Sequence, residues 1–430
     1  MRTLSRPDWG LLLLVVLLPW VSGCDQGSIS NPEVSDDLFQ SYVAIGNSIT
    51  AGLQSGGINA NTQQESYAAL LADQMNTPFK IPALQPPGCP PPLAQAFPPE
   101  TIAPDVNCAL RSPSASGPLN NVAVPNAAVV DVLSNRRPSS NTNELTSFIL
   151  GGRTQIEAAK DASPSFVSAW IGNNDVLGGA ILGDTTLVTP VDSFRTRYSQ
   201  MVDELESIES LQGGVFLKVA DVTLIPHFSS GAAYNQAIPQ AQNQGIVPSN
   251  FRLNNCATAT STLVPFRYGA ALLQVAQAVP SETITLDCSQ DLTVEGAIKQ
   301  SISSPSVEAG ALQQIGAEIK RISLLRPQET AFLANRVATL NQIIEDEVAN
   351  NENFVTVNPN ALFANNSDQV PAFPNLASDA PFGPLFSLDG IHPSGAAHRL
   401  VTNAIIERIT STPSFQVTNQ ELSFVPSPSL

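Results

Sequence analysis

Charged residues and metal ligands are both scarce in this chain of 430 residues. Asp, Glu, Lys and Arg make up 13% of the sequence, which holds three His and five Cys. No Cys-x-x-Cys, His-Glu-x-x-His or Gly-x-x-x-x-Gly-Lys-Ser/Thr motif occurs, which excludes a zinc finger, a zincin and a P-loop nucleotide site. Lys and Arg number 20 against 37 Asp and Glu, a net charge of −17, so the chain lacks the basic surface that nucleic acid requires. We therefore expect no metal, no cofactor and no nucleic-acid partner.

Long apolar runs are missing too, apart from one near the start. Leu11–Leu18 is unbroken but too short to span a bilayer comfortably, and a small positive region precedes it. The segment 21–24, Val-Ser-Gly-Cys, resembles a bacterial lipobox, which predicts cleavage before Cys24 and lipidation of its sulfur. Residues 1–23 would then be a signal peptide and residues 24–37 a lipidated tether, anchoring the protein to a membrane of the bacterial cell envelope. The alternative is an ordinary secretory signal that happens to precede a cysteine.

The number of cysteines is odd, and lipidation of Cys24 would leave four. These four are Cys89, Cys108, Cys256 and Cys288. An exported protein can keep disulfides, because its compartment is oxidising. The simplest pairing is local and joins Cys89 to Cys108 and Cys256 to Cys288. Four cysteines allow three pairings, however, and free buried thiols are a further alternative.

Short apolar runs alternate with amphipathic stretches along the rest of the chain. The runs predict five strands, at residues 41–45, 121–124, 166–171, 214–220 and 354–357. Apolar residues at helical spacing predict helices at 64–75, 190–208, 307–325, 330–348 and 394–409. This alternation is typical of an α/β fold with a parallel sheet covered on both faces. We expect one domain over residues 38–412, with large loop insertions at 77–118 and 229–305 and a tail at 413–430.

Polar motifs follow the predicted strands, and another stands before the last helix. Gly46-Asn47-Ser48 follows the first strand, where a tight turn can present a nucleophilic hydroxyl, although a capping serine is the commoner use of such a pattern. Asn126 lies in the turn after the second strand. Gly172-Asn173-Asn174-Asp175 follows the third, and an Asn amide there can donate to an oxyanion, unless the motif is a plain turn. Asp389 and His392 are three residues apart, so the carboxylate can orient the imidazole.

In this order, the four motifs resemble the sequence blocks of the SGNH, or GDSL-type, serine hydrolases, a family of esterases and lipases. The resemblance implies a catalytic triad of Ser48, His392 and Asp389. It implies an oxyanion hole made by the backbone N–H groups of Ser48 and Asn126 and by the side-chain amide of Asn174. It also implies a flavodoxin-like three-layer α/β/α sandwich, with five parallel strands in the order 2-1-3-4-5.

The chain departs from the family pattern at two positions. Asn47 stands where the family has the Asp of its name, and this Asp is not a member of the triad. Asn126 stands where the second block has Gly. A backbone donor survives any substitution except Pro, and Asn tolerates a positive φ better than most residues.

The resemblance implies a serine ester hydrolase that forms an acyl-enzyme with a carboxylic ester, either a lipid, an acylated glycan or a small ester. It is strongest to cell-envelope lipoprotein members of the family. Two alternatives stay open: a non-catalytic envelope binding lipoprotein on the same fold, and an acyltransferase that uses the same triad. Among the residues outside the motifs, we expect His398 and Trp170 to be structural. His227 could line the rim of the pocket or serve in packing.

Overall fold

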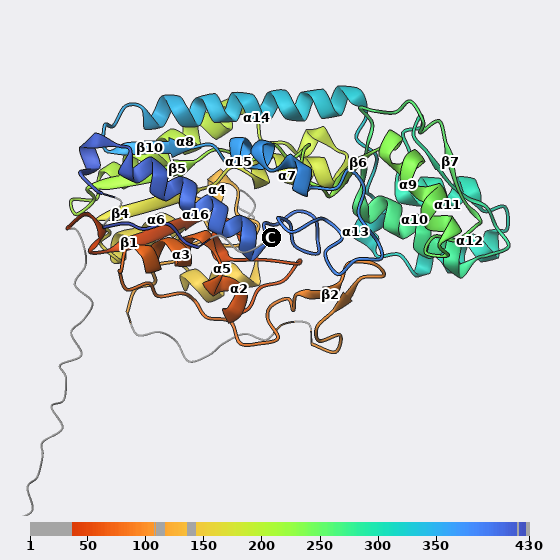
Figure 1. Cartoon of the computed structure of the whole chain (residues 1–430), viewed down its shortest axis with the longest axis horizontal. Helices are drawn as coiled ribbons and strands as arrows, with labels where there is room; N and C mark the ends of the chain where they lie inside the picture. The colour runs from red at the N-terminus through yellow and green to blue at the C-terminus, as the bar shows by residue number, and fades with distance from the viewer. Residues whose placement is uncertain (1–36, 107, 109–116, 136–142, 419–420, 427–430) are drawn as a thin grey trace, which may run out of the picture. The chain divides into compact units, whose positions relative to one another are not determined.

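The computed structural model describes residues 37–106, 108, 117–135, 143–418 and 421–426. Cys24, the predicted signal peptide and the tether up to residue 36 lie outside these residues. The centre of the fold is a parallel sheet with the strand order β1-β4-β5-β10 (Figure 1). Its strands are β1 (Tyr42–Gly46), β4 (Phe166–Trp170), β5 (Gly213–Leu217) and β10 (Phe354–Val357). Every residue of β1, β4 and β5 is buried, as expected of a parallel sheet covered on both faces. The predicted α/β fold class is confirmed.

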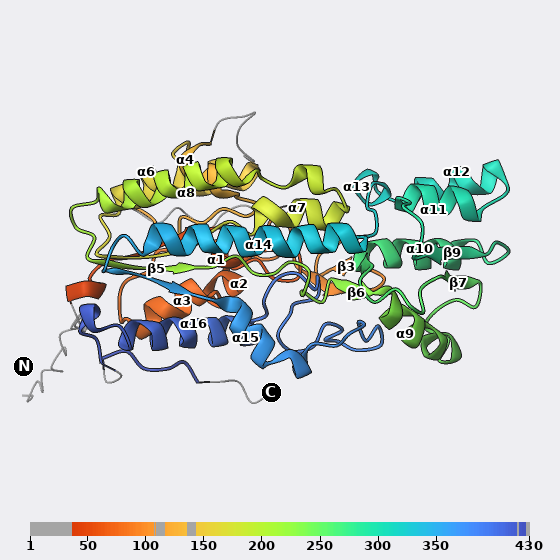
Figure 2. The ribbon, with the colours of Figure 1, turned by 90° about the horizontal axis from the view of Figure 1, so that it is seen from above.

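Alternate residues of the strands point to opposite faces of the sheet and feed two apolar clusters. Val43 and Ile45 of β1 belong to the first cluster, and Tyr42 and Ala44 belong to the second. Figure 2 shows the helices in layers on either side of the strands. The helices that supply the first cluster are α4 (Val129–Leu133), α5 (Glu144–Leu150), α6 (Gln155–Asp161), α7 (Asn174–Leu182), α8 (Val191–Glu206) and α14 (Pro327–Val348). Those that supply the second are α3 (Tyr67–Gln74) and α16 (Gly395–Thr410).

The predicted second strand is reduced to a single bridge. Asn121 pairs in parallel with Ala44 of β1, at the edge opposite β10, so the segment 121–124 occupies the position expected from the order 2-1-3-4-5. Beyond Ala44 the ladder is incomplete. The Val124 N–H still donates to the Gly46 carbonyl at 3.2 Å, but the Gly46 N–H bonds the side chain of Gln155 instead of the segment 121–124. The Gln155 Oε1 accepts from the Gly46 N–H at 2.9 Å, and its Nε2 donates to the Gly46 carbonyl at 3.0 Å. A buried glutamine thus replaces part of a strand.

Two predicted helices are each divided in the structure. The stretch 64–75 breaks between α2 (Ala60–Gln64) and α3, because Ser66 caps α3 by accepting from the Ala69 N–H at 3.2 Å. The stretch 307–325 contains α12 (Pro305–Gln313) and α13 (Ala317–Lys320), with Gly316 as the N-cap of α13. The short helix α15 (Pro359–Asn365) and the 3-10 turns η1 (Asp37–Phe39), η2 (Thr185–Leu187), η3 (Ser367–Gln369) and η4 (Pro413–Phe415) complete the sandwich. Within the segment predicted as a tail, Phe415, Val417 and Leu422 are buried in the second cluster, and Val425 is buried as well.

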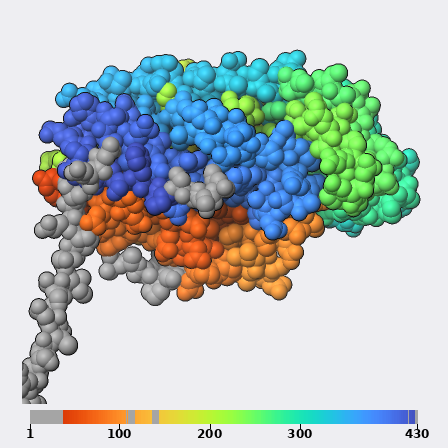
Figure 3. All heavy atoms as spheres, in the orientation of Figure 1, coloured from red at the N-terminus to blue at the C-terminus, as the bar shows by residue number. Residues whose placement is uncertain are grey.

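Residues 229–324, called the inserted segment below, carry an apolar cluster of their own. This region was expected to be a loop at 229–305, but it contains α9 (Gly231–Asn243), α10 (Phe266–Ala278), α11 (Val294–Ser301), α12 and α13. Its weak periodicity reflects short elements: β6 (Phe228–Ser230) pairs with β8 (Leu263–Pro265), and β7 (Phe251–Asn254) pairs with β9 (Ile284–Asp287). In Figure 3 the inserted segment, green to teal, gathers at one end of the described residues.

Both locally paired disulfides are present. Cys256 and Cys288 join within the inserted segment, and Cys89 joins Cys108 in the other predicted insertion. The described residues of that first insertion hold little regular structure beyond the hairpin of β2 (Leu93–Gln95) and β3 (Glu100–Thr101). In the part of the chain that the structure describes, no helix combines the length and apolarity needed to cross a bilayer.

Candidate active site

Ser48 lies directly beyond the carboxyl end of β1, at the start of the four-residue helix α1 (Ser48–Ala51). Asn47 caps this helix, since its Oδ1 accepts from the Ile49 N–H at 3.0 Å. Gly46 makes the sharp turn possible. A Cβ at this position would lie 2.3 Å from the Thr50 hydroxyl and 2.7 Å from the Trp170 carbonyl, too close for any side chain. The sequence Gly-Asn-Ser thus turns the chain from a buried strand into a helix that begins with a hydroxyl.

Asp389 and His392 lie on one turn before α16, and this turn brings His392 to Ser48. The His392 Nε2 lies 2.9 Å from the Ser48 Oγ, and its Nδ1 lies 2.7 Å from the Asp389 Oδ2. Gly390, with φ +67°, allows the turn to fold back. With Nδ1–H donating to the carboxylate, Nε2 is free to accept the serine proton. Three residues from the two ends of the chain therefore form one hydrogen-bonded series.

The Asp389 carboxylate is held from several sides. Its Oδ1 accepts from the backbone N–H of Ile391 at 2.8 Å and of His392 at 2.9 Å, and its Oδ2 accepts from the Gly56 N–H at 2.6 Å. Burial acts to raise the pKa of Asp389. The charge of His392 and the hydrogen bonds from His392 and Ile391 outweigh burial, and they hold the pKa of this carboxyl well below its usual range. The carboxylate is therefore ionised, and the turn fixes its orientation.

Asn174 and Asn126, the two asparagines expected in the oxyanion hole, lie near each other but differ in their position relative to the cavity beside Ser48. Asn174 begins α7 and lines the cavity beside Ser48, and its Nδ2 donates to the Ala127 carbonyl at 2.9 Å. Asn126, the neighbour of Ala127, has an exposed side chain and a φ of +68°, a conformation that Asn accepts. Asn126 is not one of the described residues that line the cavity. Asn174 therefore lies at the cavity with Ser48 and His392, whereas Asn126 lies on the turn that Asn174 bonds and does not line the cavity.

Asp175 connects the turn that carries Asn174 to the turn that carries Asn126. Its Oδ2 accepts from the Val129 N–H at 2.9 Å, at the start of α4, and its backbone carbonyl accepts from the Thr189 N–H at 2.8 Å. Burial raises the pKa of Asp175 to about 7, against the hydrogen bond from Val129. The last residue of the Gly-Asn-Asn-Asp motif therefore holds the turn that contains Asn126.

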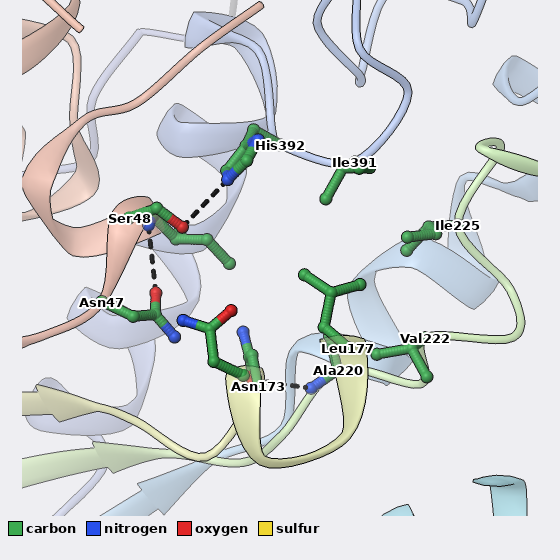
Figure 4. Close-up of a pocket in the computed structure, with 11 residues that line it drawn as sticks. Asn47, Ser48, Asn173, Leu177, Ala220, Val222, Ile225, Ile391 and His392 are labelled. Carbon is green, nitrogen blue, oxygen red and sulfur yellow. Dashed lines mark hydrogen bonds between the residues drawn. The ribbon is translucent and has the colours of Figure 1, made fainter. Parts of the chain in front are cut away.

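The cavity beside Ser48 also has walls that the sequence analysis missed. Asn47 and Asn173 line its polar side, and the amide nitrogen of Asn47 is buried without a hydrogen-bond partner among the described residues. The opposite side, called the apolar wall below, is formed by Leu177, Val222, Ile225 and Ile391 (Figure 4). A usable signal existed for Leu177, which lies one helical turn after Asn174. The other three come from loops without periodicity, and no pattern marks them.

The two remaining histidines are buried and serve in packing. His227 lies behind the Asp389 turn, where its Nδ1 donates to the Asp389 carbonyl at 3.0 Å, and burial lowers its pKa to about 4. His398 accepts from the Tyr67 N–H at 3.1 Å, and burial lowers its pKa to about 3. Trp170 is fully buried and donates to the Lys218 carbonyl at 3.0 Å. Of the two roles considered for His227, packing is therefore the one observed.

A serine, an imidazole and a carboxylate joined in series, beside amide donors at the carboxyl end of a parallel sheet, are the groups that serine-dependent acyl hydrolases use. The family model described as GDSL-like lipase/acylhydrolase matches residues 42–405. The chain belongs to this family. Its class is that of the carboxylic ester hydrolases.

Comparison with solved structures finds distant likenesses. An α/β hydrolase, LAE5, from the metagenome of Lake Arreo, Spain, is 13% identical, with a TM-score of 0.35, over 87% of this chain and 96% of its own. The acetylxylan esterase Axe2 from Geobacillus stearothermophilus is 13% identical, with a TM-score of 0.35, over 91% of this chain and 97% of its own. No curated protein sequence gave a significant match.

Proposed function

We propose that Ser48, His392 and Asp389 are the catalytic triad of a serine ester hydrolase. The observation that carries this proposal is the hydrogen-bonded series, with 2.9 Å from the Ser48 Oγ to the His392 Nε2 and 2.7 Å from the His392 Nδ1 to the Asp389 Oδ2. His392 removes the serine proton as the Ser48 Oγ attacks the ester carbonyl carbon. Asp389 stays ionised and stabilises the imidazolium.

The tetrahedral intermediate carries a negative charge on the former carbonyl oxygen. We assign its donors as the backbone N–H of Ser48, the backbone N–H of Asn126 and the Nδ2 of Asn174. Asn174 has the strongest support, because its side chain lines the cavity beside Ser48. Its present hydrogen bond to the Ala127 carbonyl holds the amide at the cavity. The imidazolium then protonates the leaving alcohol, and a water molecule activated by His392 releases the acid.

The intact machinery favours a catalyst over the first alternative, a non-catalytic binding protein. A binding protein on this fold has no physical need for an ionised carboxylate, an oriented imidazole and a serine in hydrogen-bonded series. An acyltransferase would use the same groups and differ in the acceptor of the acyl group. Adding glycerol to the assay separates these reactions, since a transferase forms the glycerol ester in preference to the free acid.

The direct test of the proposal compares p-nitrophenyl acetate hydrolysis by the wild type and by Ser48→Ala. We expect the substitution to lower kcat by a factor of about 10⁴ or more, because the nucleophile is removed. Ser207→Ala is the matched control, since this exposed serine ends α8 and bonds only the nearby Glu204 carbonyl among the described residues. Undiminished hydrolysis by a folded Ser48→Ala protein contradicts the assignment.

We also propose that the protein is lipidated at Cys24 and held at a membrane of the bacterial cell envelope. The support is the Val-Ser-Gly-Cys segment after a short apolar run, together with two disulfides of the kind that persist in oxidising compartments. The test is metabolic labelling with an alkyne fatty acid in a bacterial host. Label should enter the wild type and be absent from Cys24→Ala. Equal labelling of both proteins contradicts lipidation at this residue.

A further inference from the structure

The cavity beside Ser48 has two unlike sides. Its polar side carries the reacting groups and the side-chain amides described above. Figure 4 shows the side chains of the apolar wall gathered across the cavity from Ser48. An acyl group attached to the Ser48 Oγ would therefore place its carbonyl oxygen among the amides and its hydrocarbon tail against the apolar wall.

The space available for that tail is small. The cavity has a volume of about 30 Å³. A site for one water needs roughly 10–15 Å³ on the same measure, and an engineered cavity that binds benzene has about 150 Å³. The space beside Ser48 thus suits a few carbon atoms and falls well short of a medium-length fatty acyl chain.

Hydrogen bonds hold the apolar wall in place. Val222 lies on the loop after β5, and the Asp221 N–H of this loop donates to the Asn360 Oδ1 at 2.7 Å. The Asp221 Oδ1 in turn accepts from the Thr223 N–H at 2.9 Å, which closes a tight turn around Val222. Ile391 is fixed by its own N–H bond to the Asp389 carboxylate. Widening the cavity for a longer acyl chain would require these turns, which orient the reacting groups, to move.

We propose, on the basis of the proposed function, that this esterase is selective for short aliphatic acyl groups. The cavity takes chains of about two to four carbon atoms, on the volume comparison above. The apolar wall carries no ionisable side chain, so it also disfavours acyl groups with a second carboxylate, which would be desolvated without a partner. Leu177, Val222, Ile225 and Ile391 are the residues that set this selectivity.

The experiment measures kcat/KM on p-nitrophenyl acetate, butyrate and octanoate. For the wild type we expect octanoate to be at least about 100-fold poorer than the better of the two short esters, because chain atoms that do not fit cost 10-fold or more each. Leu177→Ala and Ile225→Ala enlarge the cavity from opposite elements, α7 and the loop after β5. Each should raise the octanoate to acetate ratio by about 10-fold or more. Leu177→Phe narrows the cavity and should lower the butyrate to acetate ratio.

Leu224→Ala is the matched control. Leu224 lies on the same loop as Val222 and Ile225, but its side chain is 72% exposed and does not line the cavity. Its substitution should leave both ratios unchanged. If the wild type hydrolyses octanoate as fast as acetate and Ser48→Ala abolishes both reactions, the selectivity proposal is wrong and the proposed function stands. If no ester is hydrolysed in a Ser48-dependent manner, both are wrong. Equal shifts by Leu224→Ala and Leu177→Ala would also overturn the assignment of the apolar wall.

Discussion

The sandwich and the inserted segment are built in different ways. The sandwich has a four-stranded parallel sheet with helices on both faces and two large apolar clusters. The inserted segment has only two-stranded pairs, β6 with β8 and β7 with β9, around a third cluster. A two-stranded pair is marginally stable by itself. The inserted segment therefore relies on the third cluster, which its helices help to build, and on the Cys256–Cys288 disulfide, whereas the sandwich also has an extended sheet.

The residues of the candidate site also come unequally from the two regions. Ser48, Asp389, His392 and the apolar wall all come from the sandwich. The inserted segment reaches the site through Phe266, which bonds His227, a buried residue just before the segment. The backbone N–H of His227 donates to the Gly390 carbonyl at 2.9 Å, and its own carbonyl accepts from the N–H of Phe266, the first residue of α10, at 2.6 Å. The sandwich therefore assembles the site, and the inserted segment supports the turn carrying Asp389 and His392.

Removing the negative charge of Asp389 should lower activity more than any other change considered below. Asp389→Asn keeps the shape of the turn but removes the carboxylate that fixes the imidazole tautomer. We expect kcat to fall by a factor of about 10⁴. Steady-state kinetics on p-nitrophenyl acetate measures this, with circular dichroism to show an unchanged fold. A loss smaller than tenfold would mean that the carboxylate does not orient the imidazole.

Removal of the second disulfide tests whether the inserted segment depends on it. For Cys256→Ser combined with Cys288→Ser, which opens a loop with a sequence separation of 32, the inserted segment should lose about 3–4 kcal/mol of stability. Hydrogen exchange should accelerate at residues 229–324 and change little in β1 and β4. The matched control is Cys89→Ser with Cys108→Ser, which should leave exchange in the inserted segment unchanged. Equal acceleration in both regions would show that they unfold as one unit.

Asn174→Ala removes a donor from the site without touching the inserted segment. We expect kcat to fall by a factor of about 10²–10³, with little change in KM, because the amide acts on the oxyanion of the transition state. The comparison variant is Asn126→Gly, which keeps the backbone donor and suits the observed φ of +68°. It should stay within a few-fold of the wild type. The reverse order of effects would place the essential donor on the other turn.

The smallest expected effect concerns His227, where the two regions meet. Its folded-state pKa of about 4 lies below the ordinary value of 6.5, so the unfolded chain binds a proton between these pH values and the folded chain does not. The stability associated with neutral His227 is thus present above pH 6.5 and is lost as the pH falls toward 4. His398 adds a similar dependence. In His227→Asn, urea unfolding across this range should show a shallower loss, by at most about 1.4 kcal/mol per pH unit. An unchanged slope would contradict a buried neutral imidazole.

Much of the sandwich is predictable from sequence because its elements have strong local patterns. The strands at 41–45, 166–171 and 354–357 are short apolar runs, and α8 and α16 carry apolar residues at helical spacing, so the structure departs little from expectation there. The second strand is shortened because the side chain of Gln155, a residue distant in sequence, accepts from the Gly46 N–H in place of the segment 121–124. A single side chain of this kind leaves no periodic signal.

The candidate site, too, is predictable from the sequence only in part. Ser48, Asn174, Asp389 and His392 lie in short motifs at predicted strand ends or turns, where a parallel sheet brings them together. The apolar wall is not predictable, since Val222, Ile225 and Ile391 stand in loops and meet only in the folded chain. The fold of the inserted segment is not predictable from the sequence for a related reason. Its core forms between short elements, and the pairing of Cys256 with Cys288 was one of three that the sequence left open.

Covalent labelling with a fluorophosphonate shows whether Ser48 is a nucleophile activated by His392. The reagent reacts with activated serines and needs no knowledge of the ester substrate. Our account predicts one adduct per chain by intact-mass spectrometry, located on the peptide that contains Ser48. The adduct should be absent from Ser48→Ala and should form far more slowly in His392→Ala. A folded wild-type protein that takes up no label, or takes it up equally after the Ser48→Ala substitution, would contradict the account.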